Sequence, residues 1–199
     1  MFIRAYRTED YAAIIDICRL TGDGGQDATP RLEHPELMGV VWAAPYLEYE
    51  PELALVIEDA GEVVGYALGA ADTVAFEKTL NESWWPALQQ KYPTSVAEQT
   101  AVDSLDRLLI KRIHSNPTTD QSLTSKWPAH LHVDLLPVVQ GKGLGRKIMD
   151  DLMQLLADAG ASGVHLGVDP RNTGAIGFYE RLGFDRLSPD SAMFTRDLP

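Results

Sequence analysis

The stretch Val133-Asp-Leu-Leu-Pro-Val-Val-Gln-Gly-Lys-Gly-Leu-Gly-Arg-Lys147 decides the fold. Its apolar run ends at Pro137, a glycine-rich turn follows, and an amphipathic helix is predicted from Leu144. The apolar residues that recur at helical spacing are Leu144, Ile148, Leu152, Leu155, Leu156 and Ala159. A strand that enters a helix through such a turn leaves backbone N–H groups unpaired where the helix dipole is positive. This arrangement favours a bound phosphate or pyrophosphate.

The turn itself supplies the residues expected to hold this anion. Glycine allows the backbone to approach a ligand closely, and Lys142 and Arg146 can reach the same charge. The expected anion-binding residues are Gln140, Gly141, Lys142, Gly143, Leu144, Gly145 and Arg146. An ordinary strand-to-helix turn with two solvated cations is the alternative. A dinucleotide fingerprint is excluded because Arg146 occupies its third glycine position, and a P-loop is excluded because Gly143 follows Lys142.

Composition limits the class of protein. A chain of 199 residues can bury a sizeable core, and we expect one domain over residues 1–199. The formal net charge of −12 argues against nucleic acid or an anionic membrane as the main partner. No apolar run approaches the roughly 18 residues that a membrane span requires. With Cys18 as the one cysteine, no intrachain disulfide can form, so we expect a soluble cytoplasmic protein.

The rest of the chain alternates between strand and helix patterns. Cys18 lies on the apolar face of the first helix, which predicts a buried structural thiol rather than a nucleophile. A β-hairpin is predicted around the turn at 59–61. The other elements predicted are a strand at 1–6, helices after Thr8, at 72–92 and at 100–114, polar loops at 21–30 and 115–127, and strands at 164–168 and 191–195.

Two segments together resemble the GNAT acetyltransferase superfamily. The first is Leu135-x-Pro137 followed by Gln140-x-x-Gly143-x-Gly145, which resembles the acyl-CoA pyrophosphate loop of that family. The second is Asn172-x-x-Ala175-x-x-Phe178-Tyr179-x-x-Leu182-Gly183-Phe184. The resemblance implies an α/β GNAT fold, with a mixed, mostly antiparallel and splayed sheet flanked by helices. It also implies acetyl-CoA as the co-substrate.

A narrower resemblance is to the acetyltransferase-like domain that ends eukaryotic O-GlcNAcase. It rests on His34-Pro-Glu-Leu37, Pro45-Tyr-Leu47, Gly65-Tyr-Ala-Leu-Gly69 and Trp85-Pro together with Gln90-Lys-Tyr92. In that eukaryotic domain the pyrophosphate loop is degenerate. This sequence departs from the domain by keeping Gln140-x-x-Gly143-x-Gly145 whole, which favours a relative that can bind the cofactor.

The GNAT resemblance also implies roles for particular residues. Backbone groups around Leu135 and Leu136 would pair with the pantetheine arm, and one N–H there would polarise the thioester carbonyl. Asn172 would hydrogen-bond the cofactor arm. Tyr179 would donate a proton or a hydrogen bond to the leaving thiolate. The structural alternatives are a helix N-cap for Asn172 and a core aromatic for Tyr179.

An amine acceptor must also lose a proton, and three candidates for the base precede the turn. Strict alternation places His130, His132 and Asp134 on one face of a strand, with Leu131, Val133 and Leu135 on the other. Any of the three could accept the proton directly or through water. Buried histidines that only form hydrogen bonds are the alternative. No metal site is predicted, because the sequence places no further ligands beside these residues.

We therefore predict direct acetyl transfer from acetyl-CoA to a primary amine in a ternary complex. No covalent enzyme intermediate is expected, because Cys18 lies far from the motifs on a core face. The acceptor stays open between a small molecule and a protein or peptide amine, the acyl group could be longer, and a homodimer is possible. A non-catalytic acyl-CoA-binding or protein-interaction module is the rival hypothesis.

Overall fold

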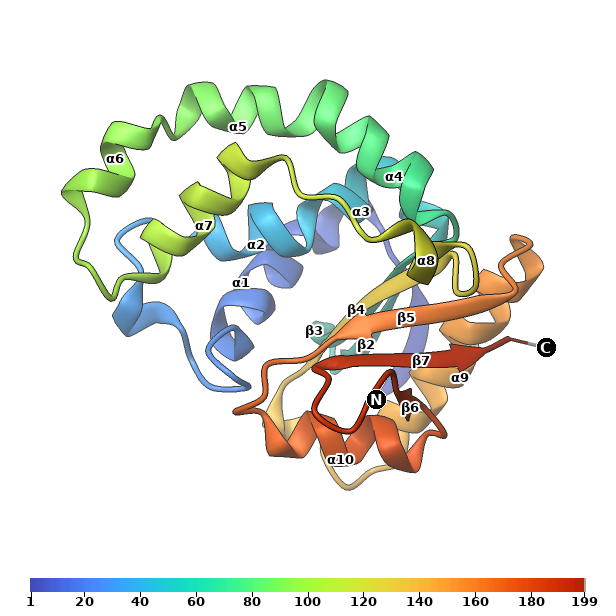
Figure 1. Cartoon of the computed structure of the whole chain (residues 1–199). Coiled ribbons are helices and arrows are strands. Elements are labelled where there is room, and N and C mark those ends of the chain that lie inside the picture. Colours follow the sequence, from blue (N-terminus) through green and yellow to red (C-terminus); the bar gives the residue numbers. More distant parts are fainter. Residues whose placement is uncertain (199) are drawn as a thin grey trace.

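The computed structural model describes residues 1–198, which form one seven-stranded sheet in the order β1-β2-β3-β4-β5-β7-β6 (Figure 1). Neighbouring strands pair antiparallel except β4 and β5, which pair parallel. The mixed, mostly antiparallel sheet predicted from the GNAT resemblance is therefore confirmed. The strands are β1 Phe2–Ala5, β2 Ala54–Asp59, β3 Glu62–Ala70, β4 Ala129–Leu135, β5 Gly163–Gly167, β6 Asp185–Arg186 and β7 Met193–Asp197.

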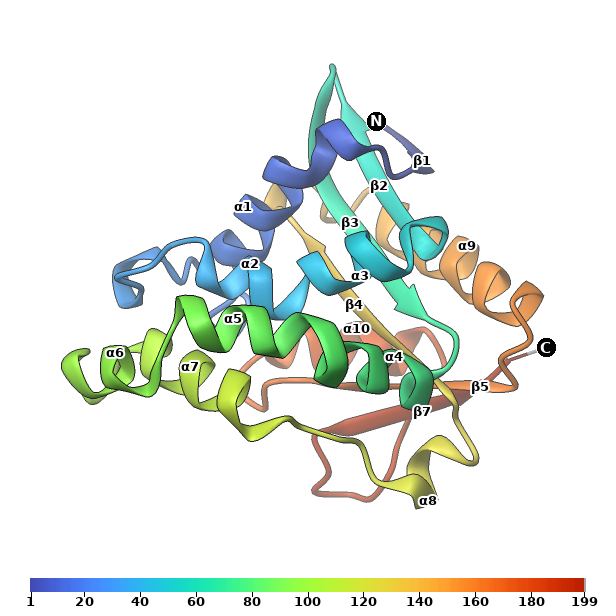
Figure 2. The same cartoon turned by 90° about the horizontal axis from the view of Figure 1, so that it is seen from above.

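Helices cover both faces of the sheet. Figures 1 and 2 show α1 to α7 over one face and α9 and α10 over the other. The first group comprises α1 Tyr11–Thr21, α2 Leu37–Trp42, α3 Ala44–Tyr49, α4 Thr73–Thr79, α5 Trp85–Lys91, α6 Thr94–Gln99 and α7 Leu105–Ser115. The remaining helices are α8 Gln121–Thr124, α9 Leu144–Asp158 and α10 Thr173–Arg181. No helix within residues 1–198 combines the length and apolar character needed to cross a bilayer.

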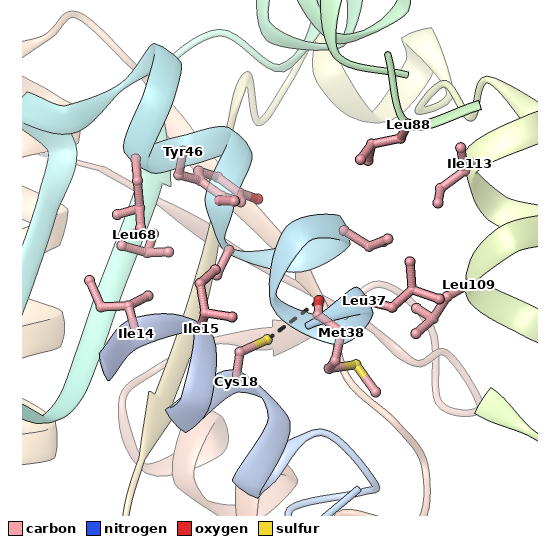
Figure 3. Packing of buried hydrophobic residues seen from close by; sticks show 14 of the residues in the cluster. Ile14, Ile15, Cys18, Leu37, Met38, Tyr46, Leu68, Leu88, Leu109 and Ile113 are labelled. Carbon is pink, nitrogen blue, oxygen red and sulfur yellow. Dashed lines mark hydrogen bonds between the residues drawn. The ribbon is translucent and has the colours of Figure 1, made fainter. Parts of the chain in front are cut away.

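Alternation along the central strands sends side chains into two separate cores. On β3, Tyr66 and Leu68 join the core beneath α1 to α7, whereas Ala67 joins the core beneath α9. Figure 3 shows the first core, in which Cys18 of α1 lies against Met38 of α2. Its Sγ donates a weak hydrogen bond of 3.8 Å to the Met38 carbonyl. The predicted burial of this thiol is confirmed.

The sheet opens between β4 and β5. These strands pair only at Ala129 with Val164 and at His130 with His165, after which β5 continues along β7. From Leu131 to Leu135, β4 therefore pairs with β3 alone. The predicted splay is present, and it exposes one backbone edge of β4 beside the glycine-rich turn.

The helical region between β3 and β4 differs in detail from the sequence prediction. The predicted helix at 100–114 begins only at Leu105, because the Ser104 hydroxyl accepts a hydrogen bond from Asp106 N–H and caps α7. A separate helix, α6, precedes it. The predicted helix at 72–92 is confirmed, with a π-helical turn at Leu80–Trp84 just before Pro86. Proline lacks the N–H of a regular helical bond, which accounts for a local irregularity there.

Candidate active site

A cavity of about 730 Å³ runs from the opening in the sheet to the glycine-rich turn. Most of the predicted cofactor residues line it: Leu135, Gln140, Gly141, Gly143, Gly145, Arg146, Asn172 and Tyr179. Leu136, Lys142 and Leu144 do not. The structure thus brings the two motif segments together around this cavity, which we call the groove. In the sequence, 26 residues lie between Gly145 of the first segment and Asn172 of the second.

The turn presents the N-terminus of α9 to this groove. Gly143 is the N-cap in a left-handed conformation (φ 75°), and no side chain caps the helix. The N–H groups of the first turn therefore have no capping partner among the described residues. At Gly145 a Cβ would lie 3.1 Å from Leu135 Cδ1 and 3.2 Å from Phe178 Cε2, so glycine lets α9 pack closely on β4 and α10. These features fit a pyrophosphate.

Cationic side chains surround the same helix end. Arg146 Nη2 donates to the Arg181 carbonyl (2.8 Å), and both arginines line the groove. Lys142 Nζ lies 3.6 Å from Met1 Sδ. Within residues 1–198 none of these three cations forms an ion pair. They supply positive charge for an anionic ligand although the chain is strongly acidic overall.

The backbone of β4 offers hydrogen bonds to a ligand in the opening. Leu136 N–H donates to Val64 O (3.0 Å), so this group is not available to a cofactor. Because alternate residues of a strand point their N–H and C=O groups to opposite sides, those of Val133 and Leu135 face away from β3. The exposed edge is therefore centred on Val133 and Leu135 rather than on Leu136.

Tyr179 of α10 and Asn172, the residue that precedes α10, both line the cavity at the opening of the sheet. Asn172 Oδ1 accepts a hydrogen bond from Ala175 N–H (3.0 Å). Asn172 is therefore the N-cap of α10, which is the structural alternative to a contact with the cofactor. Tyr179 is buried against Phe184 and Phe194, and burial raises the pKa of its phenol, with the nearby Asp134 adding to this. No group in the described chain hydrogen-bonds the Tyr179 hydroxyl, which leaves this hydroxyl available to a ligand.

A second cavity of about 620 Å³ lies beneath α1, α2, α4 and α7. It shares part of its wall with the first, including Thr21, Asp134, Asn172 and Tyr179. The two cavities therefore meet at the splay, where Asp134 and Tyr179 are accessible from both sides. A donor in one cavity and an acceptor in the other would meet at these two residues.

Asp134 belongs to a hydrogen-bonded group with Tyr66 and His132. The Tyr66 hydroxyl donates to Asp134 Oδ2 (2.5 Å) and lies 3.2 Å from His132 Nδ1. A phenol has one proton, so His132 Nδ1–H is the donor to Tyr66, which leaves Nε2 free as an acceptor. Burial raises the pKa of Asp134, while His132 and the Tyr66 hydrogen bond lower it. The predicted alternation of β4 is confirmed for these side chains.

His130 occupies a different environment from the other two candidates. Its Nδ1 lies 2.8 Å from Thr73 Oγ1, and the rings of Tyr46, Phe76 and His165 surround it. The Thr73 hydroxyl donates to Pro128 O (2.7 Å), so His130 is the donor to Thr73. Burial lowers the pKa of His130 to about 3, and His165 and His132 add to this. A neutral, structural imidazole is the expected state.

This environment predicts a pH dependence of stability. The unfolded chain binds a proton at His130 as the pH falls below about 6.5, whereas the folded chain does so only near 3. The free energy of unfolding therefore decreases on acidification in this range, by at most about 1.4 kcal/mol per pH unit from this group. In urea unfolding series, His130→Asn should show a shallower decrease between pH 6.5 and 5. Parallel profiles for the variant and the wild type would contradict this assignment.

Cys18 lies at the site, which corrects the expectation that it is far from the motifs. Its Sγ and donor atoms of His132 and Asp134 all lie within 4.8 Å of one another. Helix α1 packs across β3 and β4, a contact that the order of the chain does not reveal. Burial raises the pKa of this thiol well above its usual value, with Asp134 adding to the shift. The trio could hold a metal ion only if the thiol lost its proton.

The sequence alone does not single out Tyr66, Thr21 or Arg112, all of which line or contact the site. Tyr66 lies directly opposite Asp134 in the β3–β4 register. That register is the signal that would have identified it, since cross-strand neighbours face the same side. Thr21 ends α1 and lines both cavities, and Arg112 enters the second cavity from α7.

Comparison with known proteins identifies the family. The acetyltransferase (GNAT) family profile matches residues 110–184. SsHAT, a protein of known structure, is 36% identical, and the match covers 98% of this chain and 97% of SsHAT with a TM-score of 0.86. The chain belongs to the GNAT acetyltransferase family. The resemblance read from the two motif segments is thereby confirmed.

Two further relatives extend this GNAT assignment. Protein O-GlcNAcase of Rattus norvegicus is 26% identical over 181 residues, which are 91% of this chain. The chain spans only 20% of the length of that protein, and the narrower resemblance to O-GlcNAcase is confirmed to this extent. The structure of yncA from Salmonella typhimurium, solved with acetyl-CoA, covers 100% of this chain and 94% of yncA (TM-score 0.57, identity 18%). This last likeness shows a shared GNAT fold.

Proposed function

We propose that this GNAT acetyltransferase moves the acetyl group of acetyl-CoA to a primary amine by direct attack in a ternary complex. The observation that carries the proposal is the meeting of two cavities at Asp134 and Tyr179. One cavity has the uncapped helix end and cations that suit a pyrophosphate. The other is lined by residues of several helices and by aromatic side chains, and it suits an acceptor.

The residues of the first cavity fit acetyl-CoA, which supplies the acetyl group as a thioester. The N-terminus of α9, with Arg146 and Arg181, would hold the pyrophosphate. The exposed edge of β4 would pair with the pantetheine amides. A backbone N–H of this edge would donate to the thioester carbonyl oxygen and stabilise the negative charge that develops there. The structure of yncA, which has the same fold, was solved with acetyl-CoA, and this supports acetyl-CoA as the co-substrate.

Asp134 is the proposed general base. Its carboxylate accepts the proton that the amine loses during attack, directly or through a water molecule. Burial keeps the pKa of Asp134 above its ordinary value, which makes it a better base than an exposed aspartate. His132 supports it through Tyr66, and its free Nε2 is a second acceptor. We assign His130 a structural role, because its lowered pKa disfavours proton uptake.

Tyr179 is the proposed general acid. Its phenol keeps its proton because burial raises its pKa, and its hydroxyl is free to donate to the departing thiolate. Tyr179→Phe is expected to leave the affinity for acetyl-CoA within about twofold and to lower kcat about 100-fold. The measurement is release of the CoA thiol with a panel of amines, beside calorimetry of acetyl-CoA. Tyr49→Phe, which alters a tyrosine outside both cavities, is the matched control.

The same panel tests the proposed activity itself. Acetyl-CoA-dependent thiol release that requires an amine, with the acetylated amine found by mass spectrometry, would support it. Micromolar binding of acetyl-CoA without turnover of any amine would instead favour the non-catalytic acyl-CoA-binding module. An unchanged kcat in Tyr179→Phe would remove Tyr179 from the acid role and leave the rest of the proposal standing.

A further inference from the structure

Arg112 places an unpartnered positive charge in the second cavity. It lies on α7 and lines that cavity with residues of α2, α4 and β4. Its Nε is buried and has no hydrogen-bond partner. Within residues 1–198, its guanidinium forms no ion pair, and its side chain donates no hydrogen bond. The other nitrogens of the guanidinium are therefore available to a ligand.

Packing fixes the position of this guanidinium. Its Cζ lies over the Trp42 ring, 4.3 Å from the ring centroid, which is a cation–π contact. Trp42 in turn lies parallel to the His132 ring, with 6.4 Å between centroids and 7° between planes. Arg112, Trp42 and His132 thus form a stack that leads from the interior of the cavity toward the proton-accepting group.

The nearby acidic group does not neutralise Arg112 directly. Glu77 also lines the cavity, but its oxygens accept from Thr119 N–H (2.9 Å) and Thr119 Oγ1 (2.6 Å), beyond ion-pair distance of Arg112. Tyr46, His130 and His165 also line this cavity, and burial disfavours their charged forms. The arginine side chain itself stays protonated in a protein.

A partly buried guanidinium without an acceptor is unfavourable unless a ligand supplies one. Burial of polar N–H groups costs free energy when no partner is present, and hydrogen bonds to charged groups are the strong ones. Carboxylates match the fork of a guanidinium in geometry and charge. The chain contains 29 acidic residues against 17 basic ones, yet none of the described carboxylates takes this position.

We propose that Arg112 binds a carboxylate carried by the amine acceptor, so that the substrates are amino acids or related amino carboxylates. The inference rests on the proposed function of the site. The carboxylate would stand at Arg112 and the amine would stand near Asp134, where the two cavities meet. This pair of contacts would orient the amine toward the thioester and would exclude amines without an acidic group.

Binding of product analogues tests the inference without relying on turnover. The full chain, saturated with CoA, is titrated by calorimetry with N-acetylated amino carboxylates that differ in the spacing between nitrogen and carboxylate. Each is paired with its neutral carboxamide. We expect at least one carboxylate to bind tenfold or more tightly than its carboxamide. Absence of any such preference across the panel, including absence of binding, would overturn the proposal.

Variants of two residues on α7 test whether Arg112 causes the preference for the carboxylate over the carboxamide. Arg112→Gln should remove it, whereas Lys111→Gln, which deletes an exposed charge on α7, should keep it. Arg112→Lys keeps the charge without the planar fork, and it should retain part of the preference even if Arg112→Gln proves unstable. A carboxylate preference that survives in correctly folded Arg112→Gln, judged by circular dichroism, would also overturn the proposal.

Turnover then separates this inference from the proposed function. If amines with and without a carboxylate are acetylated at equal kcat/KM, the assignment of Arg112 fails and the acetyltransferase proposal stands. If carboxylates bind through Arg112 but no amine is acetylated, the binding site stands and the proposed activity fails. If the acetyltransferase proposal and the Arg112 proposal both hold, Arg112→Gln should lower kcat/KM for the amino carboxylate by about 10- to 100-fold.

Discussion

Replacement of Asp134 by asparagine is expected to lower kcat by about 10²- to 10⁴-fold, the usual contribution of a general base. Asparagine has nearly the same shape and can still accept the hydrogen bond from Tyr66, but it cannot accept the amine proton. The affinity for acetyl-CoA should change little, because Asp134 lies at the junction rather than at the pyrophosphate end. The measurement is steady-state thiol release beside calorimetry of acetyl-CoA.

The pH profile of the same variant distinguishes a base from a structural carboxylate. A carboxylate acts as a base only when deprotonated, so wild-type kcat should decrease as the pH falls through the pKa of Asp134. Burial raises this pKa, which places the decrease above the range of an exposed aspartate. In Asp134→Asn this decrease of kcat at low pH (the acid limb of the profile) should disappear, and the remaining rate should follow the fraction of neutral amine.

Tyr66→Phe is the matched control for this prediction. It removes the 2.5 Å hydrogen bond to Asp134 and leaves the carboxylate in place. Loss of a hydrogen bond to the charged form should raise the pKa of Asp134 further, so the acid limb should shift to higher pH with a smaller loss of maximal rate. If Asp134→Asn keeps kcat within about twofold of wild type, the base lies elsewhere, and His132→Gln becomes the decisive variant.

The sequence predicts the parts of this site that depend on local pattern. The turn at Gln140 to Arg146 is predictable because glycine content, helical spacing and charge all lie within one short segment. The shared face of His130, His132 and Asp134 is predictable because alternation is a local property of a strand. The splay follows from the GNAT resemblance, and the structure confirms all three features.

Long-range contacts account for what the sequence could not provide. Tyr66 reaches Asp134 through the β3–β4 register, and Cys18 reaches His132 through the packing of α1 on the sheet. Arg112 enters the second cavity from α7, a helix that carries no motif. The sequence pattern predicts a helix from Thr100, but α7 begins at Leu105 because Ser104 caps it there. Contacts of this kind between distant elements are set by tertiary packing and not by residue spacing along the chain.

The backbone edge of β4 shows how the structure sharpens a family resemblance. Leu135 and Leu136 are equally plausible from the motif, but only one can point to the opening. The hydrogen bond from Leu136 N–H to Val64 O fixes the alternation and assigns the open edge to Val133 and Leu135. The same parity directs Asp134 into the second cavity beside His132. One hydrogen bond therefore orients the donor edge and the proposed base relative to each other.

Gly143→Glu is expected to lower the affinity for acetyl-CoA by at least about 100-fold. The added carboxylate would stand at the uncapped N-terminus of α9, where it would take the N–H groups that the pyrophosphate needs and repel its charge. Loss of two charge-assisted hydrogen bonds, each worth about 1.5 to 3 kcal/mol, is enough for this effect. Isothermal calorimetry of acetyl-CoA against wild type and variant measures it.

The left-handed backbone of Gly143 makes a strain control necessary. A side chain there costs about 1 to 2 kcal/mol even though a Cβ would meet no atom within 4 Å. Gly160→Glu adds the same side chain at another open left-handed position (φ 92°), beyond α9 and outside both cavities. It should lose similar stability and keep the affinity for acetyl-CoA. Equal affinity in Gly143→Glu and wild type would place the pyrophosphate elsewhere, whereas equal losses in both variants would show that strain, not charge at the helix N-terminus, controls binding.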